Sequence, residues 1–402
     1  MNTNALPACA GGRPIRPRDR FLVFGQPVLG DAEIEAMVDC LRRRWIGTGP
    51  KVHEFERAFA AYRGSPHAVA VASCTAALHL SILALGIVAG DEVITTPMTF
   101  CASINAIIHT GATPVLADCD RWTMNLTAEA IEAKITPRTK AILVVHMCGR
   151  PCDMAAIMAI ARRHSLRVIE DCAHAIETTI DGRPVGTFGD VGCFSFYATK
   201  NITTAEGGMI LTTDEALADR IKILALHGLS KDAWKRFADS GYQHYEVIAC
   251  GYKYNMTDLQ AALGLAQLEQ IERFARRRGE IWGLYDQAFA DLPCALPPPP
   301  SPGTVHARHL YTPLLRLEDL RANRDAVLDA LTAENIGAGV HYLAITQHRY
   351  YRDTYGWRAE DVPNAEYVGA RTLSLPLSAG LDDQDVADVC LALRRILLHF
   401  AR

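Results

Sequence analysis

Seven short apolar runs, separated by stretches with helical periodicity, constrain the fold of this chain more than any other feature. Short β-branched runs are typical of strands, and their alternation with helices is typical of α/β proteins. Because these runs are apolar on both faces, they indicate a largely parallel, buried sheet. The runs are Ala68 to Ser73, Glu92 to Pro97, Thr113 to Asp118, Ala141 to His146, Arg167 to Asp171, Gly192 to Tyr197 and Gly207 to Thr213.

Helical periodicity marks both sides of this region. Asp31 to Trp45 and Val52 to Tyr62 are expected to form helices before the first strand, and a long helix is expected over Thr257 to Arg278. The stretch Pro297 to Pro302 (PPPPSP) is stiff, so we expect a linker or surface loop near the start of a second unit. The expected organisation is an irregular extension over 1–20, a large domain over 21–278 and a small C-terminal α/β domain over 279–402.

Composition excludes several classes of protein. The 402 residues are 49% hydrophobic, enough for one large core and a smaller one, and the net charge of −4 disfavours a nucleic-acid partner. No apolar run approaches the roughly 20 residues that cross a bilayer, and residues 1–20 lack an apolar signal core. We therefore expect no membrane partner and a cytoplasmic location, where the 12 cysteines remain thiols.

No metal is expected. Cys148 and Cys152 form the closest cysteine pair, and His306 and His309 the closest histidine pair. Neither pair has the second matching pair that a structural metal site requires.

The run Val71 to Leu80 (VASCTAALHL) indicates the end of a strand, a turn of small residues and the start of a helix. Free N–H groups at a helix N-terminus, together with the Ser73 and Thr75 hydroxyls, would bind a phosphate. An ordinary helix cap would use the same residue types. The chain contains neither a G-x-G-x-x-G fingerprint nor a G-x-x-x-x-G-K-[ST] loop, which argues against a nicotinamide enzyme and a P-loop nucleotidase.

Asp171 ends a buried strand in the run Ile169 to Ala175 (IEDCAHA), with His174 three residues further on. A carboxylate at the carboxyl end of such a strand faces the crevice where α/β sheets bind ligands. There it requires a cationic or N–H partner. The alternative is an Asp that caps the next helix.

Lys200 lies in FSFYATKNITTAEGG, after an apolar strand and before a polar turn. A desolvated lysine loses part of its proton affinity, and an unprotonated amine can form an imine with an aldehyde. The alternative is a lysine in a surface turn. Together with Asp171, Ser195 and the turn at Thr75, however, Lys200 completes the set that pyridoxal phosphate requires: an imine-forming amine, an acid for the pyridine nitrogen and a phosphate cradle.

At this point the sequence resembles the fold type I pyridoxal phosphate enzymes, and within them the sugar aminotransferases often called the DegT/DnrJ/StrS family. The resemblance runs from about Gly25 to the C-terminus, and it implies an aspartate aminotransferase-like fold. That fold has a large domain with a mostly parallel mixed sheet flanked by helices, and a smaller C-terminal α/β domain. The most specific segments are SCTAALHL, TTPMTF, EDCAHA, FSFYATKNITTAEGG and GYKYNMTDLQAALGLAQL.

The resemblance also implies roles for individual residues. Lys200 would hold the cofactor as a Schiff base, the internal aldimine, and later shuttle a proton between the cofactor and substrate carbons. Asp171 would pair with the pyridinium nitrogen, and His174 would lie near the phenolic oxygen of the ring. Phe100 would stack on the ring face. The phosphate would be held by Cys74, Thr75 and Ser195.

The segment Gly251 to Asp258 (GYKYNMTD) differs from the usual family pattern, which is close to G-Y-N-Y-R. In the family this loop reaches the phosphate of the neighbouring subunit, so a homodimer with shared active sites is implied. Lys253 and Asn255 are both candidates for that contact. The same Lys-Tyr-Asn variant is familiar in members that act on uridine-diphosphate 4-keto sugars.

Two further segments are similar to family regions near the substrate. Gly339 to Asp353 is similar to a segment beside the sugar, with His341 and His348 as candidates, although both could be ordinary histidines of the small domain. Gly47 to Pro50 resembles the loop through which the substrate enters, with Gly47 and Thr48 as candidates.

The implied reaction moves an amino group from glutamate to the keto group of a nucleotide-linked sugar, with an NDP-4-keto sugar favoured, in amino-sugar biosynthesis. The cofactor would alternate between pyridoxal 5'-phosphate and pyridoxamine 5'-phosphate. A keto-cyclitol of the scyllo-inosose type is the alternative substrate. The dehydratases of the family carry histidine in place of Lys200, and the presence of Asp171 and Lys200 disfavours a non-catalytic regulatory protein.

Overall fold

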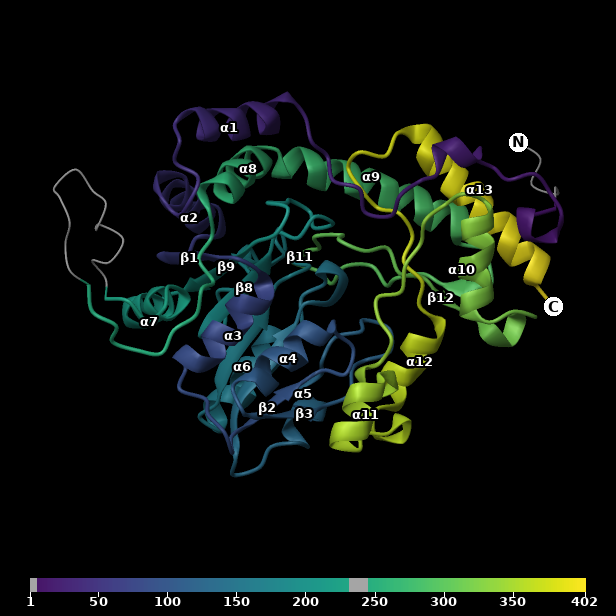
Figure 1. The fold of residues 1–402 in the computed structure, drawn as a ribbon. Coiled ribbons are helices and arrows are strands. Elements are labelled where there is room, and N and C mark those ends of the chain that lie inside the picture. Colours follow the sequence, from purple (N-terminus) through teal and green to yellow (C-terminus); the bar gives the residue numbers. More distant parts are fainter. Residues whose placement is uncertain (1–5, 231–244) are drawn as a thin grey trace.

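A seven-stranded sheet forms the centre of the computed structural model, which describes residues 6–230 and 245–402 (Figure 1). The strand order is β1-β9-β8-β5-β4-β2-β3, and every pairing is parallel except those of β9, which is antiparallel to β1 and β8. The mostly parallel mixed sheet predicted from the sequence is therefore confirmed. Its strands are β1 His67–Val71, β2 Glu92–Thr95, β3 Thr113–Leu116, β4 Thr139–Val145, β5 Arg167–Asp171, β8 Val191–Ser195 and β9 Gly208–Thr212.

Helices cover both faces of this sheet, because alternate residues of its strands are apolar on each side. Val69 and Ile210, on one face, belong to the apolar core formed with α3 and α7. Ala70 and Leu211, on the other face, pack with α2 and α8. The helices of this unit are α1 Asp31–Arg42, α2 Pro50–Arg63, α3 Cys74–Ala84, α4 Cys101–His109, α5 Ala128–Glu132, α6 Met154–Arg163, α7 Glu215–Ala225 and α8 Asp258–Glu269.

The single helix predicted over Thr257 to Arg278 is wrong, because the structure has two helices there. α8 ends at Glu269, and α9 runs over Ile271–Phe289. Between them the N–H of Gln270 turns back to the carbonyl of Gln267 (3.1 Å), a tighter bond than that of an α-helix. α9 therefore leaves in a new direction and crosses to the C-terminal part of the chain (Figure 1).

The C-terminal part packs around the second half of α9. Ile281, Tyr285 and Phe289 of α9 are fully buried in one core with residues of α10 and α13. The expected domain boundary at residue 278 thus falls inside a helix. The remaining helices are α10 Arg324–Ala333, α11 Arg349–Tyr355, α12 Pro363–Arg371 and α13 Asp383–Phe400; the remaining strands are β6 Thr179–Ile180, β7 Arg183–Pro184, β10 Cys294–Ala295, β11 Thr304–Val305 and β12 Leu314–Leu315.

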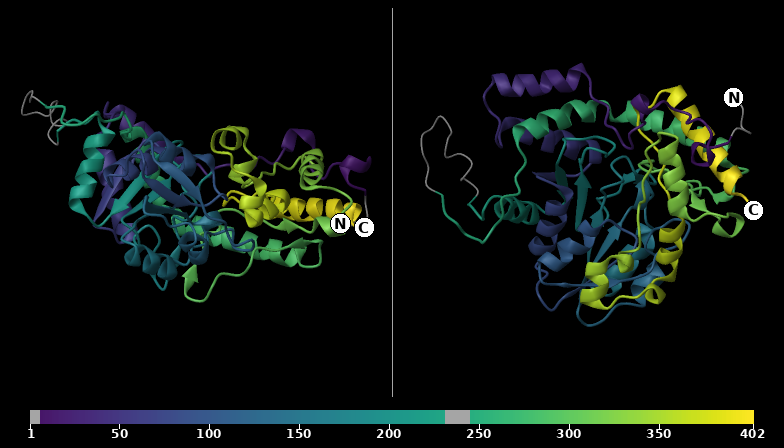
Figure 2. Two further views of the ribbon diagram at one scale, coloured as in Figure 1. Left: turned by 90° about the horizontal axis from the view of Figure 1, so that it is seen from below. Right: turned by 45° about the vertical axis from the view of Figure 1, so that its right-hand side comes forward.

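The N-terminal segment packs on this C-terminal part. The Arg16 guanidinium is buried and contacts Asp385 (2.7 Å) and Asp388 (2.8 Å) of α13, and Leu22 lies in the same core as α9. The N-terminal segment from residue 6 onward and the C-terminal helix α13 therefore lie on one side of the molecule (Figure 2). Short 3-10 helices occur at Ala8–Ala10, Arg18–Arg20, Met147–Gly149, Leu317–Asp319, Ile345–Gln347 and Ala359–Asp361.

Within the described ranges, none of the helices combines the length and the apolar character that crossing a bilayer would require.

Candidate active site

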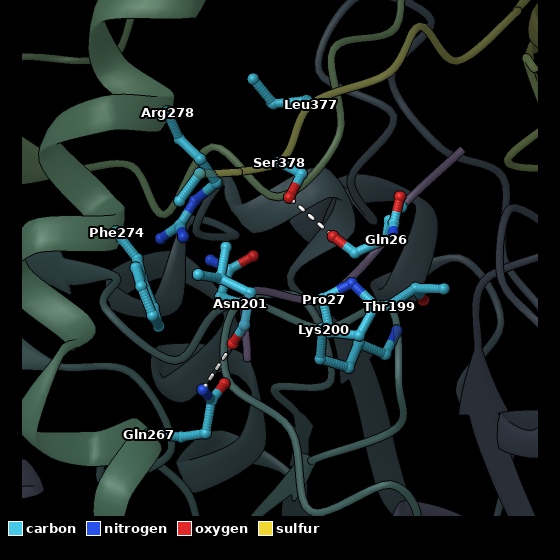
Figure 3. A pocket seen from close by; sticks show the side chains of 13 residues that line it. Gln26, Pro27, Thr199, Lys200, Asn201, Gln267, Phe274, Arg278, Leu377 and Ser378 are labelled. Carbon is cyan, nitrogen blue, oxygen red and sulfur yellow. Dashed lines mark hydrogen bonds between the residues drawn. The ribbon is translucent and has the colours of Figure 1, made fainter. Parts of the chain in front are cut away.

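Lys200 lies in the turn that follows β8, and its N–H binds the carbonyl of Tyr197 (2.9 Å). The segment from Gly25 to Val28 passes over this turn (Figure 3). Gly25 has φ +68°, and an added Cβ would lie 3.1 Å from Thr199 Cβ, so a side chain would push the segment away. Burial lowers the pKa of the Lys200 amine to about 8, although nearby Cys74, Asp171 and Cys148 oppose the shift. The amine is therefore a much better nucleophile near neutral pH than an exposed lysine.

Asp171 ends β5 and is 5% exposed. Its Oδ2 accepts a hydrogen bond from the Ser103 hydroxyl (2.8 Å) and its Oδ1 accepts one from the Ala173 N–H (3.0 Å). Burial raises the pKa of this carboxyl, while these two donors and the Lys200 charge favour the carboxylate. Asp171 therefore lies at the carboxyl end of a buried strand, as the sequence indicates.

The phosphate ligands expected from the sequence lie close together. Ser73 caps α3 by accepting the Ala76 N–H (3.1 Å), so Cys74 and Thr75 stand in the first turn, where N–H groups have no helical acceptor. Ser195 pairs with Gly208 across β8 and β9. An added Cβ at Gly208 would lie 2.6 Å from the Ser73 carbonyl, so only glycine lets β9 approach α3 this closely. Ser195 is thereby brought to the start of α3.

His174 and His341 both lie near enough to Lys200 for its charge to act on them. The ring of His174 accepts the Cys148 N–H at Nδ1 (3.3 Å), and its Nε2 is 3.2 Å from the Tyr342 hydroxyl. His341 Nδ1 is 2.8 Å from Ser374 Oγ. Burial and the Lys200 charge lower the pKa of His174 well below its usual value and that of His341 to about 4. Both rings are therefore neutral at physiological pH.

Phe100 precedes α4 and is 57% exposed. Its ring centroid lies 5.9 Å from that of Tyr342. An accessible aromatic face therefore stands at the edge of the group formed by Lys200, Asp171 and His174, where the sequence places a stacking residue.

Four other candidates form a second group, beside the edge strand β1. The Thr48 hydroxyl donates to the Met256 carbonyl and accepts from Asn255 Nδ2, both at 2.6 Å. The Gly47 carbonyl accepts the Asp258 N–H (2.7 Å), and Asn255 forms an isolated antiparallel β-bridge with Val71 of β1. Lys253 is exposed in the same segment. Asn255 Oδ1 is buried and has no hydrogen-bond partner among the described residues.

His348 belongs to neither group. It is exposed at the start of α11, and its ring lies 6.3 Å from that of Tyr351.

The structure adds residues that the sequence analysis missed. Asn201, next to Lys200, donates to Glu177 (2.7 Å), and its Oδ1 is 2.9 Å from His309 Nδ1. Arg278 of α9 pairs with the same Glu177 inside the protein. In the sequence, Asn201 is marked only by its position next to Lys200, and Tyr342 only by its position next to His341. The hydrogen-bond partners of both residues lie far away in the sequence, so no local pattern indicates them.

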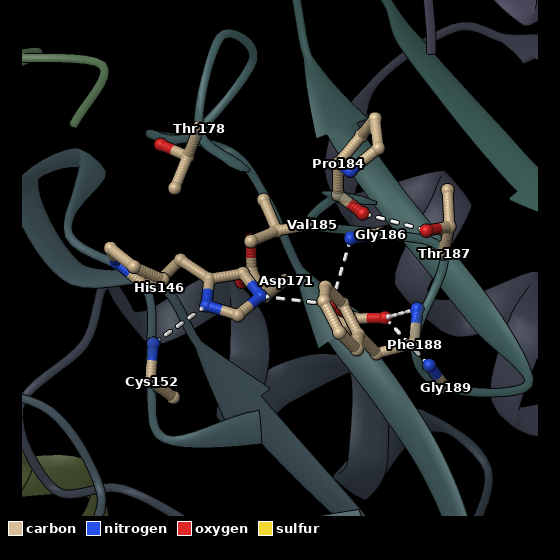
Figure 4. A network of polar contacts seen from close by, with 12 residues as sticks. His146, Cys152, Asp171, Thr178, Pro184, Val185, Gly186, Thr187, Phe188 and Gly189 are labelled. Atoms are coloured by element: carbon tan, nitrogen blue, oxygen red, sulfur yellow. Dashed lines mark hydrogen bonds and ion pairs between the residues drawn. The ribbon is translucent and has the colours of Figure 1, made fainter. Parts of the chain in front are cut away.

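A buried cluster of His146, Glu170 and Cys172 has ligand atoms within 4.8 Å of one another. Figure 4 shows His146 of this cluster, with Cys152 on one side and the turn at Gly186 to Gly189 on the other. The Glu170 carboxylate accepts three N–H groups, from Gly186, Phe188 and Gly189 at 2.7 to 2.8 Å, and lies 3.1 Å from His146 Nε2. His146 Nδ1 accepts the Cys152 N–H (3.1 Å). Hydrogen bonds therefore occupy the histidine and carboxylate atoms that a metal would need.

Comparison with known proteins identifies the family. The family model of the DegT/DnrJ/EryC1/StrS aminotransferases matches residues 27–394. The chain belongs to this family. It is 48% identical over 386 residues to the spore coat polysaccharide biosynthesis protein SpsC of Bacillus subtilis, a match that covers 95% of this chain and 99% of SpsC.

Solved structures of aminotransferases share the fold. Spr1654 of Streptococcus pneumoniae, assigned as a sugar aminotransferase and solved in its PLP form, gives a TM-score of 0.87 at 31% identity, covering 94% of this chain and 99% of Spr1654. Its PMP form gives the same TM-score at 32% identity, covering 94% and 98%. DesI, solved in the presence of its TDP-sugar product, gives 0.84 at 32% identity, covering 96% and 94%.

Proposed function

We propose that this protein is a pyridoxal phosphate aminotransferase that moves an amino group from glutamate to the keto group of a nucleotide-linked sugar, an NDP-4-keto sugar above all, in amino-sugar biosynthesis. The observation that carries the proposal is the Lys200 amine, whose pKa is lowered to about 8, in one group with buried Asp171. The PLP and PMP forms of Spr1654 support the cofactor, and the TDP-sugar product of DesI supports the substrate class.

The residues of the site fit pyridoxal phosphate. Lys200 supplies an amine for its aldehyde, Asp171 an acid for its ring nitrogen, and Phe100 an aromatic face. The phosphate would be held by the N–H groups of Cys74 and Thr75 at the start of α3 and by Ser195. When bound, the cofactor carries the amino group between substrates and withdraws electrons from the reacting carbon.

Each of these side chains has a defined task. The Asp171 carboxylate holds a proton on the facing ring nitrogen, because an anion next to that nitrogen favours its charged form. Lys200 Nζ can take a proton from the substrate carbon and return it, since its lowered pKa makes both protonation states accessible near neutral pH. Neutral His341 can exchange hydrogen bonds with a sugar hydroxyl, and Gly47, Thr48 and His348 remain proposed substrate contacts.

The proposal includes a homodimer with shared active sites. Within one chain Lys253 and Asn255 belong to the group beside β1, with Gly47 and Thr48. The family resemblance, in which this loop reaches the neighbouring subunit, leads us to place their phosphate contact in the site of the partner subunit. A cytoplasmic location agrees with the 12 free cysteines, which a reducing compartment preserves.

Cofactor binding is tested on the purified protein. We expect a yellow protein that borohydride converts to a form with the cofactor fixed to Lys200, as mass spectrometry of the peptides would show. Lys200→Ala should abolish both fixation and turnover. Lys140→Ala, which removes an exposed lysine at the start of β4, should change neither. A protein that never takes up pyridoxal phosphate would contradict the proposal.

The substrate class is tested by incubation with glutamate and a panel of nucleotide-linked 4-keto sugars, with scyllo-inosose for comparison. We expect 2-oxoglutarate to form with at least one nucleotide sugar. Formation only with scyllo-inosose would identify the keto-cyclitol as the acceptor. A coloured protein that transfers no amino group to any acceptor would indicate a regulatory role.

A further inference from the structure

Asn201, the residue after Lys200, uses every hydrogen-bonding group of its side chain. Its Nδ2 donates to Glu177 Oε2 (2.7 Å) and to the carbonyl of Ala307 (3.1 Å). A carboxylate and a carbonyl can only accept, so the orientation of the amide is settled. Asn201 Oδ1 is therefore the acceptor for Nδ1–H of His309 (2.9 Å). These bonds tie the turn that carries Lys200 to two other segments of the chain.

Glu177 joins this amide to α9. The residue is 7% exposed, and its carboxylate binds Asn201 through Oε2 and Arg278 of α9 through Oε1. Burial raises the pKa of the carboxyl, whereas Arg278 and Asn201 favour its charged form. Arg278 is 2% exposed, and within the described ranges its Nε has no acceptor and no other carboxylate pairs with it. The buried guanidinium therefore depends on Glu177 for its counterion.

The charge of Arg278 lies close to the Lys200 amine. Arg278, Asn201 and Lys200 line one cavity (Figure 3). Burial lowers the pKa of His309 well below its usual value, and the charges of Lys200 and Arg278 both add to this shift, so both cations act on the same ring. A cation beside an amine lowers the pKa of that amine, because a second positive charge is disfavoured. Without Glu177, an unbalanced Arg278 would act on Lys200 in this way.

Other ionisable side chains also surround the two charged groups. Those that interact with Lys200 are Cys74, Cys148, Asp171, His174, His309 and His341. Tyr62 and Arg63 lie on the other side, towards Glu177. All of them stay in place in the variants described below, so a change in the titration of Lys200 reports on the network itself.

We propose that Glu177 is a positioning residue for Lys200: it fixes the turn of Lys200 through Asn201, and it balances Arg278, so that no uncompensated charge stands beside the amine. The inference rests on the proposed function, because it concerns the amine that forms the imine. It also connects α9, which enters both cores of the molecule, to the reacting amine.

The first test follows imine formation between the cofactor-free protein and added pyridoxal phosphate, by absorbance, over a range of pH. The rate reports the unprotonated fraction of the Lys200 amine, so its pH midpoint should be about 8 in the unmodified protein. Glu177→Gln leaves Arg278 unbalanced and should lower this midpoint by about half a unit to one unit. Arg16→Met is the matched control. It removes another buried guanidinium, which pairs with two carboxylates of α13, and should leave the midpoint unchanged.

The second test separates the balance of charge from a loss of structure. Glu177→Gln combined with Arg278→Met removes both charges, so the midpoint should return to the unmodified value. A purely structural effect would instead accumulate in the double variant. Because the double variant buries no unpaired charge of this pair, it can be measured even where Glu177→Gln is too unstable to purify, and a displaced midpoint in it would overturn the inference.

The third test concerns the turn. Asn201→Ala removes its side-chain bonds without changing any charge. Misplacement of a reacting group by about 1 Å costs on the order of 100-fold in rate, so kcat should fall by about 10- to 100-fold, while KM for the amino donor stays unchanged. Combined with Glu177→Gln, the loss in kcat should be smaller than the product of the two separate losses, because both variants break the same contact.

The outcomes are distinguishable. An unchanged midpoint in folded Glu177→Gln would overturn the inference. A raised KM with an unchanged kcat in Asn201→Ala would also overturn it, because Asn201 would then serve substrate binding instead of the position of Lys200. An unmodified protein that forms no imine contradicts the proposed function instead, since no rate would exist to measure.

Discussion

Lys200 is held in surroundings that disfavour its charge, and this has a consequence for stability. Burial lowers its pKa from 10.5 to about 8 in the folded protein, whereas the unfolded chain keeps the ordinary value. Between these two pH values the unfolded chain binds more protons, so the stability of the cofactor-free protein rises with pH in this window. Below pH 8 both states are protonated, and the full cost of the buried charge remains.

Lys200→Met should therefore stabilise the cofactor-free protein below pH 8. The advantage should decrease by on the order of 2 kcal/mol as the pH rises from 8 to 10.5. Denaturant unfolding at several pH values measures this difference. Lys140→Met, at an exposed lysine, should show no such trend, and a constant advantage for Lys200→Met across this range would contradict the shifted pKa.

Individual site residues were predictable where a local pattern marks them. Asp171 ends a strand, Thr75 lies in the first turn of a helix, and Lys200 lies in the turn after a strand, as the sequence pattern indicates. Ser103 and Tyr342 were not predictable, because they act through contacts with residues 68 and 168 positions away in the sequence. His348 has the residue type of a ligand but an exposed position, which only the tertiary structure reveals.

Glu170 connects β5 to the turn at Gly186 to Gly189. Its two oxygens accept three backbone N–H groups and the His146 ring donor, and the residue is fully buried. Because Asp171 is the next residue of the same strand, this network also holds the end of β5 in place.

Glu170→Gln should reduce the free energy of unfolding by about 2 to 4 kcal/mol, because the amide N–H₂ would meet N–H donors in a buried site. Denaturant unfolding measures the loss. Glu132→Gln removes an exposed carboxylate that pairs with Arg163, and it should change stability by less than about 1 kcal/mol. Equal losses in the two variants would contradict the structural role of Glu170.

Secondary structure was predictable where apolar periodicity is long. The seven strands of the sheet and helices α1 and α2 lie where the pattern indicates, within a few residues. The break between α8 and α9 was not predictable, because Gln270 is an ordinary helix residue and the surrounding periodicity continues. The two-residue strands β6, β7, β10, β11 and β12 are too short to leave any periodic signal.

α9 contributes side chains to the cores of both parts of the molecule and so connects them. Phe274, near its start, lies in the core with α2 and α8, whereas Tyr285 and Phe289 lie in the C-terminal core. Arg278, between them, pairs with buried Glu177 of the large part. We therefore expect the two parts to unfold together, in one thermal transition.

Gly279→Pro should disrupt this coupling. Proline inside a helix costs about 3 kcal/mol or more, so calorimetry should show a lowered transition or two separate ones. Gly279→Ala is the control. Its Cβ would meet only the flexible end of Arg308, at 3.3 Å, and it favours helix, so the single transition should be retained. Two transitions in the unmodified protein would contradict the mechanical role of α9.

Shared active sites can be tested by mixing inactive variants. If Asn255 serves the partner's site, a dimer of one Lys200→Ala chain and one Asn255→Ala chain has one site with both defects and one with neither. We expect co-expression to restore up to half of the wild-type activity per mixed dimer. Activity no higher than the mean of the two separate variants would place Asn255 in its own chain's site.

The contacts of Arg16 also set the order of events during synthesis of the chain. Its partner Asp385 lies 369 positions later, so the ribosome, which adds about 5 to 20 residues per second, needs on the order of 20 to 70 s to make that partner after Arg16 has emerged. The sheet, by contrast, is complete once Thr212 has been made. The N-terminal segment therefore stays undocked, solvated or bound by a chaperone, while the large part folds. Its docking is among the last steps in the folding of the chain.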